Sequence, residues 1–400
     1  MVIYYDVVII GAGPAGLSTA IAVAKNKLKC LIIDKNQEIG FPVRTSGASW
    51  LPDMIELGIP KECLNPIKAV TIIGPHEKAS ITFDKPIVCI LDVTKVYQYL
   101  ASKAKYYGAD LLLESSVKNV LMEQGIVRGV EIVNNNNNLI RIRSKVVVDA
   151  SGYSATLVRK LGFLTHWSRT GVGFQYNIES SNVNYHEAVL FLGERFAPSG
   201  YGWFFPWARN RARIGIGVIK PDSNAIPAFL ANKLMRTIYA SSLIGDITII
   251  NKEAGAFPCS GPLEKTVTNS FLAVGDAAGL GSPLHGEGIR YAIKFGTIAG
   301  DVISRAIKLN DVSEKSLFSF EKTWRAAEGR NFKIALAIQK RISKYSDAQW
   351  DRSIKYLREI AEKDIELVVQ MFKTNFSYRN IWRVFKYSPL KAIKTLLSNL

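Results

Sequence analysis

Uninterrupted apolar runs recur in the first part of the chain and again near its last third. They cover residues 7–10, 30–33, 146–148 and 271–274, and each is followed by a glycine or an aspartate. Strands that are buried on both faces of a parallel sheet show this pattern. The segment between the first two runs is rich in small residues and is typical of a helix. The pattern therefore predicts a parallel α/β sheet whose strand ends lie along one edge.

Other segments show helical or alternating periodicity. Residues 92–107 and 289–307 each predict a helix, because their apolar positions recur every three or four residues. Residues 125–133 and 139–143 predict the two strands of a hairpin, with five asparagines as its turn. Beyond residue 312 the apolar positions again have helical spacing. We expect the last part of the chain to be all-helical.

The first apolar run leads into a G-x-G-x-x-G turn formed by Gly11, Gly13 and Gly16. The first glycine allows a sharp turn, the second allows backbone N–H groups to approach a phosphate, and the third allows close helix packing. A pyrophosphate would lie at the N-terminus of the helix, where unpaired N–H groups favour an anion. Asp34 ends the next run, where an acid binds the ribose. These residues predict a bound adenine dinucleotide.

The chain contains this glycine motif once, which indicates one long ligand rather than two nucleotides. FAD fits, because Asp276 follows the last apolar run and would bind the ribityl chain. The helix that begins near Gly288 would direct its positive end at the flavin ring and stabilise the charge of the reduced ring. We therefore predict FAD as the cofactor.

Between residues 161 and 258, glycines, aromatic residues and short β-like runs replace the β-α alternation. This composition is typical of an antiparallel sheet that carries a pocket. The predicted fold class is α/β, with a discontinuous Rossmann-like domain, a β-sheet domain and a helical region. The predicted boundaries are 1–68, 92–160 and 260–310 for the FAD-binding domain, 69–91 and 161–259 for the substrate domain, and 311–400 for the C-terminal helical region.

Composition narrows the function classes. The four cysteines are far apart and have no C-x-x-C spacing, which argues against a zinc site, an iron-sulfur cluster or a disulfide framework. We expect no metal and a reducing compartment. No signal peptide and no membrane-spanning segment is expected, because the uncharged stretch 7–24 has the glycines and proline of a strand, turn and helix.

Charge points to a membrane surface. The net charge is +17, and six basic residues but no acidic residue follow Glu366. This asymmetry favours an anionic membrane over nucleic acid, for which no motif is present. Leu390, Ile393, Leu397 and Leu400 would share one helical face, as in an interfacial anchor or in a last helix packed on the protein. The expected location is cytoplasmic, peripheral at the inner face of the cell membrane.

Three glycine-rich segments resemble those of flavoproteins with the p-hydroxybenzoate hydroxylase architecture. They are residues 11–16, 149–152 and 275–289. A fourth segment, residues 198–206, matches the P-x-x-Y-x-W-x-F-P motif of the geranylgeranyl reductase family in full. On these residues the chain resembles that family. The resemblance implies hydride transfer from N5 of reduced FAD to isolated double bonds of an isoprenoid lipid, such as the geranylgeranyl chains of archaeal ether lipids.

The resemblance also implies the partners and the substrate wall. No second dinucleotide domain is expected, so electrons would come from NAD(P)H or a ferredoxin-type protein. Tyr201, Trp203 and Phe205 alternate along a strand and would form, with Pro206, an apolar wall for the isoprenoid. A generic aromatic core of the sheet is the alternative reading of this alternation.

The expected FAD contacts extend beyond the glycine turn. The full predicted set is Gly11, Gly13, Ala15, Gly16, Asp34, Lys35, Arg44, Thr45, Ser46, Ala48, Val117, Ser151, Gly152, Asp276, Gly286, Gly288 and Ile289. Two positions depart from the family. Thr45 stands where relatives often carry a cysteine, and a hydroxyl is a much weaker acid than a thiol. Val93 stands where many relatives carry an arginine.

Thr45, Tyr201 and His285 are the candidate catalytic side chains. His285 would replace the missing thiol as the acid, because an ordinary histidine titrates near neutral pH. A structural histidine fits the same pattern. Two further functions stay open on the sequence: an FAD-dependent monooxygenase or quinone-linked dehydrogenase of the same fold, and a non-catalytic prenyl-binding carrier.

Overall fold

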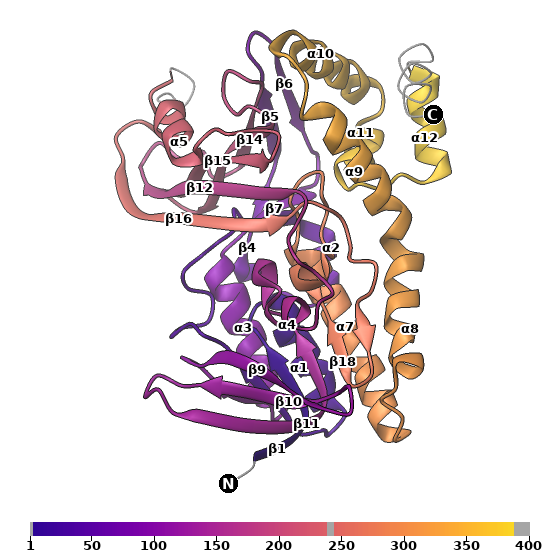
Figure 1. Ribbon diagram of the computed structural model, residues 1–400. Coiled ribbons are helices and arrows are strands. Elements are labelled where there is room, and N and C mark those ends of the chain that lie inside the picture. Colours follow the sequence, from indigo (N-terminus) through magenta and orange to yellow (C-terminus); the bar gives the residue numbers. More distant parts are fainter. Residues whose placement is uncertain (1–2, 238–243, 388–400) are drawn as a thin grey trace.

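A computed structural model of the chain describes residues 3–237 and 244–387. Two large sheets lie one above the other, and a run of helices extends along one side of both (Figure 1). The fold is mixed α/β, as predicted, with a parallel Rossmann-like sheet, a mainly antiparallel sheet and C-terminal helices. The predicted domain boundaries stay a prediction.

The lower sheet has eight strands, and its centre is parallel. Its main order is β17-β18-β11-β1-β2-β8, and all of these neighbours pair in parallel except β17 and β18. The strands are β1 (Ile3–Ile10), β2 (Cys30–Ile33), β8 (Asp110–Leu112), β11 (Leu139–Asp149), β17 (Val267–Thr268) and β18 (Phe271–Ala273). The predicted apolar runs thus form the centre of this sheet.

The predicted hairpin is present, but its second strand is longer than expected. β10 (Ile126–Val133) pairs antiparallel with β11, and β9 (Ser116–Glu123) pairs with β10. The sequence treats 139–143 and 146–148 as separate runs, whereas β11 is one strand of 11 residues. Its first half completes the hairpin and its second half lies beside β1, so one strand joins the wet hairpin to the buried sheet.

Helices cover the lower sheet. They are α1 (Pro14–Lys25), α3 (Val93–Tyr106), α4 (Thr156–Lys160) and α7 (Ile289–Lys308), and all except α4 agree with predicted helices. Asp92 caps α3 by accepting a hydrogen bond from the Lys95 N–H at 3.2 Å. α7 packs closely on α1, since a Cβ at Gly296 would lie only 2.4 Å from the Ala15 carbonyl oxygen.

The upper sheet has seven strands in the order β16-β12-β15-β14-β13-β5-β6. They are β5 (Ala69–Ile73), β6 (Lys78–Thr82), β12 (Thr170–Glu179), β13 (Glu187–Leu192), β14 (Gly200–Ala208), β15 (Arg211–Lys220) and β16 (Thr248–Pro258). All neighbours are antiparallel except β13 and β5, so the expected antiparallel sheet contains one parallel pair. One face carries an apolar core that includes side chains of α5 (Pro227–Met235).

Short elements connect the two sheets. β3 (Ala48–Trp50), β4 (Leu64–Ile67) and β7 (Val88–Leu91) form a separate three-stranded sheet. The predicted substrate segment 69–91 is therefore divided, because β5 and β6 join the upper sheet and β7 does not. The remaining short helices are α2 (Leu51–Glu56), η1 (Lys61–Cys63), η2 (Gly152–Ser154) and η3 (Gly275–Ala278).

The last described part is helical, as predicted. It consists of α8 (Glu314–Trp324), a π-helical turn (Arg325–Gly329), α9 (Arg330–Ile342), α10 (Asp347–Lys363), α11 (Ile365–Phe372) and α12 (Tyr378–Tyr387). These helices, orange to yellow in Figure 1, extend from the lower sheet to β6 of the upper sheet. The anchor residues predicted within 388–400 lie outside the described residues. Within 3–237 and 244–387, no helix is long and apolar enough to cross a membrane.

Candidate functional site

In the glycine turn between β1 and α1, the three glycines differ in the space that the surrounding chain leaves for a side chain. Gly11 has φ +109°, and a Cβ there would lie 2.3 Å from the Ala150 carbonyl oxygen. A Cβ at Gly16 would lie 2.0 Å from the Gly11 oxygen, whereas a Cβ at Gly13 would meet no described atom within 4 Å. The fold itself thus requires Gly11 and Gly16. The open space at Gly13 is what a pyrophosphate at the N-terminus of α1 would need.

Asp34, at the end of β2, holds the turn in place. One carboxylate oxygen accepts a hydrogen bond from the Ala12 N–H at 2.7 Å, and the other accepts from the Asn36 N–H at 2.8 Å. A carboxylate has about four acceptor positions, so capacity remains for ribose hydroxyls. The residue fits the predicted ribose contact.

The acid at the end of β11 has a different role. Asp149 is fully buried and accepts hydrogen bonds from the N–H groups of Leu157 at 2.7 Å and Val158 at 2.9 Å. It therefore satisfies the N-terminus of α4 instead of facing a ligand. The Ser151 hydroxyl likewise accepts from the Thr156 N–H at 2.8 Å. The interpretation of this strand end as one side of the cofactor crevice depends on the Ser151 and Gly152 backbone rather than on the acid.

Asp276, in η3 after β18, carries a carboxylate with no hydrogen-bond partner in residues 3–237 and 244–387. Burial raises its pKa from 3.8 to about 6. It lies beside the first turn of α7, because a Cβ at Gly288 would be 3.2 Å from its Oδ1 atom. A partly enclosed carboxylate without a donor suits the hydroxyl groups of a ribityl chain. The residues present therefore fit FAD.

The two other strand ends meet at the glycine turn. A Cβ at Gly275 would lie 2.7 Å from the Ala15 Cβ, so η3 and the start of α1 are in contact.

Gly152 has φ +69° and faces open space, and Gly286 has φ +68° and packs on the Phe257 ring. Ile289 is buried, Val117 packs against the lower core, and Lys35 and Arg44 are exposed. The roles of these residues toward FAD stay predictions.

The predicted alternation of aromatic side chains is present in β14, with Trp203 and Phe205 buried, and its role as a substrate wall stays a prediction. Tyr201, Trp203 and Phe205 share one face of β14, with ring centroids 5.8 Å and 6.4 Å apart in sequence order. Phe204, between them, points into the opposite core. Pro206 lies in the same strand, and its carbonyl oxygen accepts a hydrogen bond from Asn65 at 2.7 Å.

Glycines on neighbouring strands make room for the Trp203 indole. A Cβ at Gly215 would lie 2.6 Å from a ring atom of Trp203, at Gly217 3.3 Å and at Gly173 3.4 Å. The indole therefore lies against a strip without side chains, which we call the glycine bed. Gly255 on β16 allows a different approach, because a Cβ there would lie 2.1 Å from the Arg44 carbonyl oxygen. The loop before β3 thus lies on the same sheet.

Tyr201 and His285 connect the wall to the loop before α7. The Tyr201 hydroxyl donates a hydrogen bond to the His285 carbonyl oxygen at 2.6 Å. Burial raises the pKa of Tyr201 and lowers the pKa of His285 from 6.5 to about 4. The premise that His285 titrates near neutral pH is therefore wrong, and the neutral imidazole is a poor proton donor. Its ring stacks on Phe372 at 5.6 Å.

The Thr45–Ser46 segment is held by its backbone. The Thr45 carbonyl oxygen accepts from the Gln175 side chain at 3.1 Å, and the Ser46 carbonyl oxygen accepts from Arg213 at 3.3 Å. The Thr45 side chain is half-buried and makes no hydrogen bond among the described residues. A catalytic role for its hydroxyl stays a prediction.

Three buried polar residues near this segment escaped the sequence reasoning. Arg213, Gln175 and Glu253 are 2%, 3% and 5% exposed. Arg213 is the one residue with a signal in the sequence, because a charged residue occupies an apolar strand run. Gln175 and Glu253 stand in ordinary alternating strands, and only the strand register brings them together.

The C-terminal helices fasten the loop that precedes α7. Buried Gln339 of α9 accepts a hydrogen bond from Arg169 at 2.7 Å and donates one to the Pro283 carbonyl oxygen at 2.6 Å. Lys373 forms an ion pair with Asp53 at 2.6 Å, and Arg290 of α7 pairs with the same carboxylate at 3.0 Å. The helical region therefore holds the loop that precedes α7 and the start of α7 itself.

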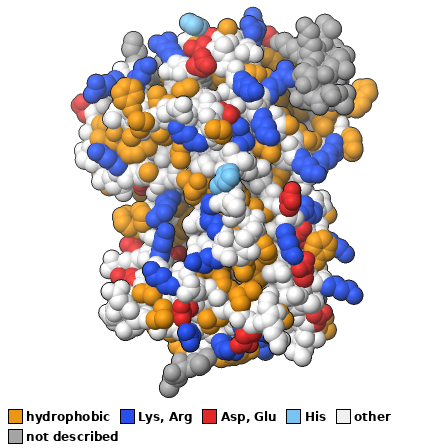
Figure 2. Space-filling view, in the orientation of Figure 1, with side chains coloured by type: hydrophobic (Ala, Val, Ile, Leu, Met, Phe, Trp, Pro, Cys, Tyr) orange, Lys and Arg blue, Asp and Glu red, His pale blue; other side chains and the backbone are white. Residues whose placement is uncertain are grey.

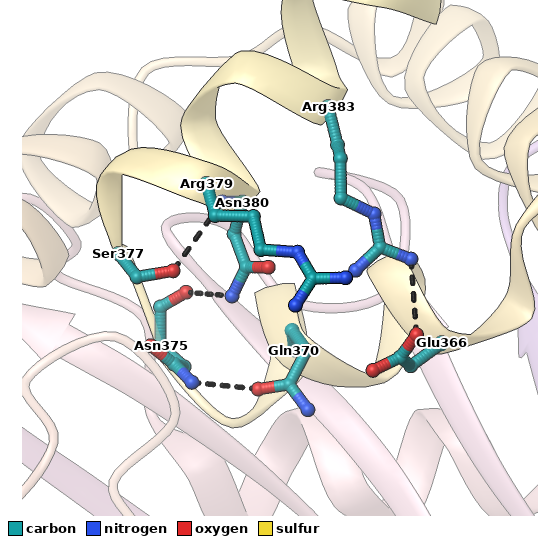
Figure 3. A pocket seen from close by; sticks show the side chains of 7 residues that line it. All are labelled: Glu366, Gln370, Asn375, Ser377, Arg379, Asn380 and Arg383. Carbon is teal, nitrogen blue, oxygen red and sulfur yellow. Dashed lines mark hydrogen bonds and ion pairs between the residues drawn. The ribbon is translucent and has the colours of Figure 1, made fainter.

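A hollow of about 200 Å³ lies between α11 and α12, away from the glycine turn. Arg379 and Arg383 extend into it from α12, opposite Glu366 and Gln370 of α11 (Figure 3). Arg383 is paired with Asp364 and with Glu366 at 3.2 Å, so the positive charge in the hollow is largely compensated. None of the predicted site residues lines it.

Comparison with known proteins gives the family. A family model described as lycopene cyclase protein matches residues 6–349. The chain is 35% identical over 374 residues to the digeranylgeranylglycerophospholipid reductase of Methanocaldococcus jannaschii, which covers 89% of this chain and 91% of that protein. The chain belongs to the geranylgeranyl reductase family.

Solved structures agree with this family. A geranylgeranyl bacteriochlorophyll reductase-like protein from Thermoplasma acidophilum matches all of both chains with a TM-score of 0.87 and 26% identity. A halogenase in complex with FAD matches 94% of this chain and 85% of its own, with a TM-score of 0.67 and 14% identity, and shows the fold alone. The family is one of oxidoreductases, and it implies FAD as the cofactor.

Proposed function

We propose that this member of the geranylgeranyl reductase family is an FAD-dependent reductase that saturates double bonds of geranylgeranyl chains in ether lipids. The observation that carries the proposal is the hydrogen bond from Tyr201 to the His285 carbonyl oxygen at 2.6 Å. It joins the aromatic wall to the loop that leads into α7, where the flavin ring is expected. FAD, once reduced, supplies the hydride for the double bond.

The residues of the chain would bind and orient the cofactor and the substrate, and would exclude water from the site. Gly13 and the first turn of α1 would hold the pyrophosphate, Asp34 the ribose and Asp276 the ribityl chain. Trp203 and Phe205 would hold the isoprenoid and exclude water, which keeps the hydride from other reactions. Burial lowers the pKa of His285 to about 4 and leaves its imidazole neutral near pH 7, so we do not assign the proton that completes the reduction to this residue.

An apolar contact surface continues from the wall to the C-terminal helices. Trp203 and Tyr201 cluster with Val70 and Leu190, and Val70 and Leu190 also belong to a cluster that includes Phe372 of α11. We propose that the isoprenoid chain extends along this surface. The name of the relative from Methanocaldococcus jannaschii, a digeranylgeranylglycerophospholipid reductase, supports a lipid of this kind.

A mass measurement tests the function. The FAD-loaded protein is reduced with dithionite under anaerobic conditions and mixed with a geranylgeranyl ether lipid. Mass spectrometry is expected to show two added hydrogens for each saturated bond, and oxidised protein is the control. Uptake of oxygen with NAD(P)H and hydroxylated product would instead indicate a monooxygenase. A colourless protein that takes up no FAD would indicate a carrier.

We also propose that the protein works at an anionic membrane surface. The net charge is +17, and Lys and Arg side chains outnumber acidic ones on the face in Figure 2. Tyr378 and Trp382, one turn apart on α12, are both 77% exposed, and such aromatic side chains favour the membrane interface. Replacing both by serine should reduce sedimentation with anionic vesicles, whereas Tyr106→Ser on α3 should not. Equal binding by both variants would contradict this location.

A further inference from the structure

One buried amide joins the aromatic wall to the loop that carries Thr45. Gln175, on β12, accepts a hydrogen bond from the Trp203 indole N–H at 2.9 Å. Its Nε2 group donates to the Thr45 carbonyl oxygen at 3.1 Å and to the Glu253 carboxylate. Two elements that are expected to contact the substrate and the flavin thus share one side chain.

The neighbours of Gln175 leave its amide a single orientation. A carboxylate only accepts hydrogen bonds and an indole N–H only donates them, so Nε2 faces Glu253 and Oε1 faces Trp203. Arg213 balances the charge of Glu253, with Nε 3.6 Å from the carboxylate. The Nη1 group of Arg213 donates to the Ser46 carbonyl oxygen at 3.3 Å and to the Leu91 carbonyl oxygen at 3.1 Å. Adjacent loop carbonyls are therefore held by one network.

The strand register explains why these groups meet. Glu253, Gln175, Gly215 and Trp203 lie opposite one another on four neighbouring strands, in that order. The missing side chain at Gly215 lets the indole cross β15 and reach the amide on β12. Any side chain at this position would separate the two, because its Cβ would lie 2.5 Å from the Gln175 Cβ.

We propose that Gln175 is a positioning residue that fixes the Trp203 indole and the Thr45–Ser46 backbone relative to each other. This inference rests on the proposed function, in which the indole contacts the isoprenoid and the loop contacts the flavin. The network sets the spacing between the reacting double bond and the cofactor. Isoprenoid affinity depends mainly on buried apolar area. Loss of Gln175 therefore lowers kcat more than it raises KM.

The upper sheet contains a matched control. Trp207, also on β14, donates its indole N–H to the Asn177 side chain at 3.1 Å, and Asn177 lies two residues after Gln175 on β12. No hydrogen bond among the described residues links Asn177 to the Thr45 loop. Gln175→Leu and Asn177→Leu thus remove the same kind of indole–amide bond, and only the first also releases the loop.

Steady-state kinetics and hydrogen exchange test the proposal. In Gln175→Leu we expect kcat to fall on the order of 30-fold with KM changed less than about 3-fold, since misplacement by about 1 Å costs up to about 100-fold. Asn177→Leu should keep both constants within about 3-fold. In the FAD-free protein, exchange of the peptide 41–50 should accelerate in Gln175→Leu but not in Asn177→Leu.

The outcomes separate the two proposals. Equal kinetics for the two variants, or unchanged exchange in the peptide 41–50 of Gln175→Leu, would overturn the positioning role. The exchange experiment needs neither cofactor nor substrate, so it holds even if the wild-type protein saturates no lipid. Trp203→Phe, which keeps an aromatic side chain but loses the indole N–H group, should reproduce the kcat loss while leaving exchange of the peptide 41–50 slow. A normal kcat in this variant would also overturn the role.

Discussion

The glycines of the first turn and those of the glycine bed serve opposite purposes. Gly11, Gly13 and Gly16 are close in sequence and shape the backbone around an expected ligand. Gly173, Gly215 and Gly217 come from two strands and make room for a side chain of the protein itself. The first set forms a motif that a single segment reveals. The role of the second set can be recognised only once the register of β12, β14 and β15 is known. The sequence therefore predicts the role of the first set of glycines but not that of the second.

The largest effect is expected from a substitution in the glycine turn. Gly11→Ala places a Cβ 2.3 Å from the Ala150 oxygen at φ +109°, which should cost roughly 4 kcal/mol or more from clash and backbone strain. Gly13→Ala meets no described atom within 4 Å and should fold normally but bind FAD more weakly. Thermal unfolding and FAD titration measure the two effects. Normal FAD affinity in Gly13→Ala would mean that the space at Gly13 is not the pyrophosphate site.

The next largest effect is expected from a substitution in the glycine bed. Gly215→Ala places a Cβ 2.6 Å from the Trp203 ring and should cost about 1–3 kcal/mol of stability, as overpacking usually does. Gly173→Ala meets the same ring at 3.4 Å, an ordinary contact, and should be nearly neutral. Chemical denaturation of the two variants gives the comparison. Similar losses in both would show that the indole does not depend on the bed.

Asp276 lies on the side of the crevice that is expected to hold the cofactor. Its pKa is raised to about 6, so ionisation destabilises the FAD-free fold as pH rises from about 4 to 6. Asp276→Asn removes this penalty and should stabilise the FAD-free protein at pH 7 by up to about 3 kcal/mol. The same variant should lose FAD affinity. Unfolding at pH 4 and pH 7 checks the sign, because the gain should vanish at the lower pH.

The smallest effect is expected from a substitution of His285, which lies beside the aromatic wall. Its pKa is lowered to about 4, so the fold is stable with the neutral ring and loses stability as pH falls below about 6.5. Between pH 7 and pH 5 this loss should be about 2 kcal/mol. His285→Gln should flatten this part of the stability profile. It should leave lipid reduction at pH 7 within about 3-fold, and a much larger drop would restore the acid role.

Local patterns predicted much of the fold. The apolar runs, the glycine turn, the asparagine hairpin and the helix after Gly288 each lie in one continuous segment, and the structure confirms them. The family motif likewise placed Tyr201, Trp203 and Phe205 on one face, as observed. Such features follow from spacing along the chain, which the sequence shows directly.

Features that depend on distant partners were not predictable. Asp149 has the same local pattern as the other strand-end acids, yet it caps α4, because a short helix follows it closely. The shift at His285 comes from burial by elements far along the chain. Gln175 and Glu253 lie 78 residues apart and meet only through the β12–β16 pairing. Burial and register are properties of the assembled sheet rather than of either segment.

The contact of Gln339 with the Pro283 carbonyl oxygen has a consequence for the order in which the protein is made. The glycine turn, Asp34 and Asp276 are all synthesised before the helices that fasten the loop preceding α7. Gln339, Phe372 and Lys373 come later in the chain, so the contacts that fasten this loop form only after most of the chain has been synthesised.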